Sequence, residues 1–138
     1  MLIGRRELLA LPELGGTWIG ARLDTGADTS SLHAGEVDVF EKGGTDLLHF
    51  FTHNHHGERI ECEAEVFREE AVKSSTGRSL QQVFIQTPVK TMGGLEWMVR
   101  LSLADRSVMK CPMLLGRKAL AGRFVVDPQA PQVFGKLG

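Results

Sequence analysis

Apolar and polar side chains alternate along two stretches of the chain. In the first stretch, Ile60, Cys62, Ala64 and Val66 are separated by glutamates. In the second, which runs from Leu95 to Leu103, an apolar side chain falls at every second position. A period of two places successive side chains on opposite faces of a β-strand. We therefore predict two half-buried strands.

Turn signals divide other apolar runs into pairs, a pattern typical of β-hairpins. The pairs are Leu8–Leu14 with Thr17–Leu23 around Gly15-Gly16, Leu47–Phe51 with Arg59–Val66 around Asn54–Gly57, and Val83–Val89 with Leu95–Leu103 around Gly93-Gly94. The helical candidate is short, Arg117–Ala121. The pattern predicts one all-β domain over residues 1–138, either a small barrel or a sandwich.

Length and composition agree with a single globular domain. The chain has 138 residues, 42% of them hydrophobic, and a formal net charge of -1, which argues against a dedicated nucleic-acid binder. The two cysteines, Cys62 and Cys111, form no CxxC pair, and no signal peptide or membrane-spanning run is visible. We therefore expect a reduced, cytoplasmic protein that has no membrane partner.

The segment with the clearest chemical meaning is the tripeptide Asp24-Thr25-Gly26, which follows an apolar strand. It puts a carboxylate at the end of a buried strand. Thr25 can form a local hydrogen bond or reach a neighbouring loop, and Gly26 permits close backbone approach and a positive φ. Taken alone, Asp-x-Gly after a strand is usually a simple turn, so a turn without catalysis is the competing interpretation.

A second segment favours the catalytic interpretation of this turn over a simple turn. Met113–Leu120 is an apolar run that ends in Gly116-Arg117 and leads into the short helix. An apolar strand with Asp-Thr-Gly-Ala, followed at a distance by apolar-apolar-Gly-Arg, resembles the retropepsin-like aspartic peptidases. The resemblance implies a small closed β-barrel in which Gly116 leaves room beside the catalytic turn. It also implies that Asp28 and Arg117 pair and brace the site.

A closer resemblance covers nearly the whole chain. Four blocks are similar to the bacterial RimB-like family, which is also labelled as ATP-dependent zinc proteases: LDTGADTSSLHA (residues 23–34), LSLADRSVM (101–109), PMLLGRKAL (112–120) and RFVVDP (123–128). Members occur alongside RimK-type ligases that add glutamate tails to proteins. The resemblance implies an endopeptidase, in some members acting on glutamate tails. A phosphate-binding loop and an HExxH motif are both absent from the sequence, and we expect no cofactor.

The number of motifs predicts an assembly. An aspartic peptidase needs two carboxylates, one as the base for the attacking water and one as the acid for the substrate carbonyl. This chain holds one Asp-Thr-Gly. An active enzyme is therefore expected to be a twofold homodimer with Asp24 and its symmetry mate at the seam. The alternative is a catalytically idle module of the same shape that binds acidic peptides or a partner ligase.

A histidine cluster offers a rival chemistry. The cluster consists of His49, His53, His55 and His56. With Cys62 nearby, these imidazoles suggest a zinc-dependent hydrolase as a further alternative. Their spacing matches no familiar zinc module, so an exposed polar turn is favoured and no metal is expected. His33 and Cys62 are predicted to be core residues.

Substrate contacts are predicted from the hairpins and from the charge pattern. Residues near His53–Gly57 are expected to form a mobile lid, which makes His53 and His55 candidate substrate contacts; Ser74–Ser79 is the competing lid. Six bases and one acid lie between Arg100 and Arg123. This stretch reads either as a solvated face or as a surface for an acidic ligand. For an acidic peptide or protein substrate, the candidate contacts are Arg78, Arg100 and Arg106.

Overall fold

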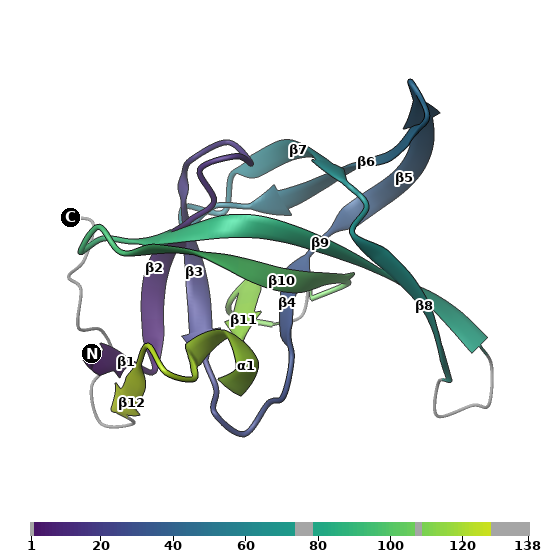
Figure 1. The fold of residues 1–138 in the computed structure, drawn as a ribbon. Coiled ribbons are helices and arrows are strands. Elements are labelled where there is room, and N and C mark those ends of the chain that lie inside the picture. The colour runs from purple at the N-terminus through teal and green to yellow at the C-terminus, as the bar shows by residue number, and fades with distance from the viewer. Residues whose placement is uncertain (1, 74–78, 107–108, 128–138) are drawn as a thin grey trace.

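A closed barrel of six strands forms the centre of the protein in the computed structural model, which describes residues 2–73, 79–106 and 109–127. In spatial order the barrel strands are β10 (Glu96–Ala104), β4 (Ser30–His33), β11 (Met113–Leu115), β3 (Trp18–Leu23), β2 (Arg6–Ala10) and β9 (Ser79–Thr91). The antiparallel pairing of β9 with β10 closes the barrel (Figure 1). The predicted all-β class and closed barrel are confirmed.

Alternating side chains explain why these segments form barrel strands. Along β3, Ile19, Ala21 and Leu23 point inward and are buried, while Arg22 points outward and is exposed. Burying each large aliphatic side chain stabilises the fold by about 1.5–3 kcal/mol. The core is continuous through the barrel, and the predicted hairpin around Gly93-Gly94 is present between β9 and β10.

The position of strand β11 in the barrel places the Asp24-Thr25-Gly26 turn. The short strand β11 lies between β3 and β4, parallel to β3 and antiparallel to β4. Leu115 is in register with Leu23, so both strands end at the same level. Asp24 and Gly116, which follow these two residues, therefore lie next to each other although they are far apart in the sequence.

A three-stranded sheet covers the end of the barrel opposite the Asp24 turn. It consists of β5 (Gly35–Lys42), β6 (Thr45–His53) and β7 (Arg59–Glu65), of which the β6–β7 hairpin was predicted. Figure 1 shows this sheet at the end where β3 begins, whereas the helix lies at the end where β3 finishes. β8 (Arg68–Lys73) pairs with β9, and the two project from the barrel (Figure 1).

The remaining elements are short. β1 (Leu2–Gly4) and β12 (Val125–Asp127) form a separate parallel pair. The helix α1 (Arg117–Leu120) agrees with the predicted Arg117–Ala121 within one residue. No helix in the described ranges is long and apolar enough to cross a membrane.

Candidate active site

Asp24 is held at the end of β3 by backbone hydrogen bonds. Its N–H donates to the carbonyl oxygen of Leu115 at 2.9 Å, and its own carbonyl accepts from the N–H of Ala27 at 3.2 Å. The carboxylate oxygen Oδ1 accepts from the N–H of Gly26 at 2.9 Å. The side chain is half-buried. The turn therefore presents a positioned carboxylate that solvent can reach.

Gly26 contributes through its N–H and its small size. A Cβ at this position would lie 3.1 Å from Oδ1 of Asp24. The positive φ that glycine permits is not used here, because Gly26 is not among the described glycines with positive φ. The neighbouring Thr25 is exposed in the single chain.

Gly116 packs directly against the loop that carries Asp24. A Cβ on this residue would meet the carbonyl oxygens of Thr29 and Ala27 at 2.5 and 2.7 Å. Its N–H donates to Oγ of the buried Ser30 at 3.0 Å, and the N–H of Arg117 donates to the carbonyl oxygen of Ala27 at 2.8 Å. The loop that carries Asp24 is therefore held against the start of α1 by direct main-chain contacts.

Asp28 and Arg117 form the ion pair that the resemblance implied. Nη2 of Arg117 lies 3.2 Å from Oδ1 of Asp28, and Nζ of Lys118 lies 3.2 Å from Oδ2 of the same carboxylate. The three side chains are 48–71% exposed, so water screens the attraction. The pair crosses from the Asp24 loop to α1 and adds to the main-chain contacts.

A comparison with protein families identifies the family of the chain. The model described as "RimB-like: Retropepsin-like aspartic endopeptidase RimB" matches residues 2–136. The chain belongs to this family. The family match covers both the Asp24 turn and β11, which ends directly before Gly116.

Curated relatives of this RimB-like chain bear a different name. Proteins named "Probable alpha-L-glutamate ligase" from Desulfotalea psychrophila and Shewanella pealeana are 34% and 36% identical to it over 139 and 140 residues. Each match covers 99% of this chain and 30% of the relative, so the chain spans about 30% of the length of these relatives. A crystal structure of a Legionella pneumophila protein of unknown function has a TM-score of 0.81 and 25% identity, covering 97% of this chain and 98% of that one.

The candidate arginines have different surroundings in this RimB-like fold. Arg100 is exposed on β10, with its Cζ 4.7 Å from the ring centroid of Phe67. Arg106 is half-buried and donates to Oγ of Ser31 and to the carbonyl oxygen of Cys111, both at 3.3 Å. Burial is the main cause that lowers the pKa of Arg106. Arg106 thus ties the segment after β10 to β4, and its predicted substrate contact is not favoured. Arg78 lies outside the described residues.

The hairpin tip near His53–Gly57 does not lie over the Asp24 turn. The N–H of His55 donates to the carbonyl oxygen of Trp18 at 2.9 Å. Trp18 begins β3, and Asp24 follows its other end, about 20 Å away at the rise of a strand. The lid expected at His53–Gly57, with His53 and His55 as substrate contacts, therefore does not agree with the structure. Of the competing lid Ser74–Ser79, residues 74–78 lie outside the described ranges.

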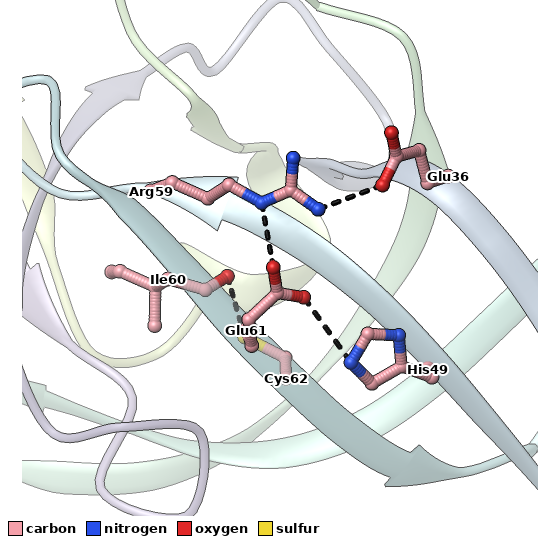
Figure 2. Close-up of polar contacts among 6 residues, drawn as sticks. All are labelled: Glu36, His49, Arg59, Ile60, Glu61 and Cys62. Carbon is pink, nitrogen blue, oxygen red and sulfur yellow. Dashed lines mark hydrogen bonds and ion pairs between the residues drawn. The ribbon is translucent and has the colours of Figure 1, made fainter.

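The histidines of the cluster do not converge on one point: His55 and His56 contact each other with ring centroids 3.7 Å apart, whereas His49 has a partner of its own. Nε2 of His49 lies 3.1 Å from Oε2 of Glu61, whose other oxygen accepts from Nε of Arg59 at 2.6 Å (Figure 2). Arg59 also reaches Oε2 of Glu36 at 2.7 Å, so this network joins β5, β6 and β7. In the described parts of the chain, no three His, Cys, Asp or Glu side chains converge as metal ligands would. The arrangement does not favour the zinc alternative.

The two predicted core residues are buried. His33 stacks on His53 with ring centroids 5.6 Å apart, and its Nδ1 accepts from the N–H of Arg106 at 2.9 Å. Cys62 is buried, and burial raises the pKa of its thiol to about 11. A thiol with such a pKa is a poor nucleophile at neutral pH, which agrees with the predicted packing role.

Ser30 and Lys118 are site residues that the sequence interpretation did not assign. Ser30 accepts the Gly116 N–H, and Lys118 shares Asp28 with Arg117. Both lie inside the family blocks: Lys118 directly follows Arg117, and Ser30 is two residues after Asp28. Only their position in those blocks could have indicated a role. The contact of Ser30 joins residues 86 positions apart, which local sequence patterns do not reveal.

Proposed function

We propose that this chain is an aspartic endopeptidase whose reactive centre forms when a second copy brings its Asp24 beside the first across a twofold axis. The observation that carries the proposal is the single Asp24 turn, with its carboxylate held by the Gly26 N–H and its loop locked on Gly116. One such carboxylate supplies half of the required pair. The exposed Thr25 is available to contact the partner's turn.

The proposed chemistry divides the work between two carboxyl groups. Two adjacent carboxylates cannot both ionise easily, so they share one proton. The ionised Asp24 takes a proton from the attacking water, and the protonated one donates to the peptide carbonyl oxygen. The Asp24 that took the water proton then donates it to the leaving nitrogen as the C–N bond breaks, and the intermediate returns one hydroxyl proton to the other Asp24, which restores the pair. The products are a carboxylic acid and an amine.

The proposed substrates are peptides or proteins that contain glutamate-rich segments. Support comes from the curated relatives named as glutamate ligases, in which the matching region is about 30% of the protein. A peptidase domain joined to a ligase would act on the same kind of chain. The basic side chains of Arg100 and Lys118, both exposed, supply charge that complements an acidic peptide.

The same comparison favours a second candidate, a non-catalytic module that binds acidic peptides or a ligase. The two candidates differ in the role of Asp24. A structure of the assembled dimer separates them: two Asp24 carboxylates within reach of one water favour the enzyme, and a larger separation favours the module.

The direct test of the peptidase is Asp24→Asn, assayed on glutamate-containing peptides with mass spectrometry of the products. We expect hydrolysis to be lost while circular dichroism and oligomeric state stay unchanged. Asp38→Asn is the matched control, because Asp38 is an exposed aspartate on β5, away from the Asp24 loop. Retained hydrolysis in Asp24→Asn, or an active monomer, would refute the proposal.

A further inference from the structure

A groove of about 550 Å³ lies on the outer face of β9 and β10, next to α1. Its apolar lining includes Phe84, Met98 and Ala119, and Gln86 adds an amide. The groove also contains Thr29 and Ser30, which follow the Asp24 turn along the chain. It is therefore adjacent to the candidate active site without containing Asp24.

Two cations line this groove. They are Arg100 from β10 and Lys118 from α1, and none of the described lining residues is acidic. Lys118 shares the carboxylate of Asp28 with Arg117, so on the α1 side of the groove one negative charge is paired with two positive charges. Arg100 lies over the ring of Phe67. Among its described residues, the groove thus keeps an excess of positive charge for a bound carboxylate.

Large apolar side chains are exposed beside these cations. Met98, which lines the groove, is 53% exposed; Phe67, which lies against Arg100 outside the lining, is 45% exposed. Exposed apolar side chains that gather around a concave surface are typical of a binding site. An occupant made only of carboxylates would satisfy Arg100 and Lys118 but would leave this apolar surface in water.

We propose that the groove binds an extended peptide segment in which an apolar side chain lies between acidic ones. The apolar side chain packs on the exposed Met98, beside the buried Phe84, and the flanking carboxylates pair with Arg100 and Lys118. As a docking site for the substrate chain outside the catalytic turn, the groove rests on the proposed peptidase function. Its peptide binding can be measured without hydrolysis.

Fluorescence anisotropy with the 138-residue Asp24→Asn chain tests the proposal. The probes are three labelled peptides, Glu-Leu-Glu-Met-Glu, a pentamer of Glu, and Lys-Leu-Lys-Met-Lys. We expect the mixed acidic peptide to bind most tightly, with affinity that falls as salt rises. Arg100→Glu and Met98→Asp should each weaken it about tenfold or more.

Two exposed residues outside the groove lining provide matched controls. Arg123→Glu makes the same change of net charge, and Met109→Asp makes the same change of polarity. Both should bind like the parent protein. Equal loss in the controls, equal binding of the Glu pentamer, or self-association that disappears with Arg100→Glu would each overturn the proposal.

A cleavage assay on the same peptides with Asp24 intact separates this inference from the proposed function. Binding without any cleavage contradicts the peptidase and leaves the groove in place. Cleavage that is insensitive to Arg100→Glu and Met98→Asp, with no measurable binding in Asp24→Asn, contradicts the groove and leaves the peptidase in place.

Discussion

Gly116 lies so close to Thr29 that a Cβ on residue 116 would be 2.5 Å from the Thr29 carbonyl oxygen. The contact is with main chain, which cannot rotate away as a side chain can. Gly116 has a φ of -90°, a conformation that other residues also adopt. The requirement for glycine is therefore steric, and it comes from the loop that carries Asp24.

Gly116→Ala is predicted to destabilise the protein and to displace the Asp24 loop. Overpacking of this kind costs about 1–3 kcal/mol. Urea unfolding followed by tryptophan fluorescence measures the loss of free energy of unfolding. Peptide hydrolysis should fall with it, because the proposed carboxylate pair depends on the position of the loop.

Gly20→Ala is the matched control for this substitution. Gly20 lies on β3, where a new Cβ would meet nothing within 4 Å. Its free energy of unfolding should stay unchanged or rise by about 0.5–1 kcal/mol, since alanine loses less conformational freedom on folding. A similar loss in both variants would show that the Gly116 contact is not special.

Strands could be predicted where one face is buried and the turn is marked by glycine. β7 and β10 follow their alternating patterns within one or two residues. β5 was missed because most of its side chains are exposed on both faces, including Val37 and Val39, so alternation carries little information. The signal for its turn was present in Gly43-Gly44, both of which have positive φ, as a two-residue hairpin needs.

The candidate site could be predicted only with the family resemblance. Local patterns place Asp24 after a strand, but the approach of Gly116 is a tertiary contact that periodicity cannot give. His49 and His53 show the opposite case, in which closeness in sequence does not bring two side chains together. His49 and His53 are close in sequence yet about 13 Å apart along β6, and each has its own partner.

Asp28→Asn is predicted to have a small effect on stability. The carboxylate pairs with Arg117 and Lys118 at the surface, and exposed pairs contribute about 0–1 kcal/mol. The free energy of unfolding should fall by no more than this, and the difference should shrink in 1 M NaCl, where the Debye length is about 3 Å. A loss that is larger and insensitive to salt would indicate a structural role beyond charge pairing.

His33 is predicted to make stability depend on pH. Burial is the main cause that lowers its pKa below 6.5, and His53 and Arg106 add to this effect while Asp105 opposes it. Since the unfolded chain binds the proton more tightly, stability should fall as the pH drops below 6.5 towards the lowered folded pKa. Protonation would also remove the acceptor for the Arg106 N–H.

Urea midpoints between pH 5 and pH 7.5 measure this effect, with His33→Asn as the comparison. The Asn side chain keeps an acceptor but does not titrate in this range. The decline of stability below pH 6.5 should be reduced in the variant. An identical decline in both proteins would assign it to other groups.

Mixing wild type with Asp24→Asn is predicted to lower activity. The loss should equal the fraction of wild-type chains that pair with a variant chain. If each active centre takes one Asp24 from each of two copies, a mixed dimer has one carboxylate and is inactive. With a ninefold excess of the variant and random pairing, the activity for each wild-type chain should fall to about one tenth. The two proteins are unfolded and refolded together before peptide hydrolysis is measured. The same excess of Asp38→Asn should leave activity unchanged, because that partner still supplies Asp24. Undiminished activity in the Asp24→Asn mixture would mean that a single chain is sufficient, which contradicts the shared pair.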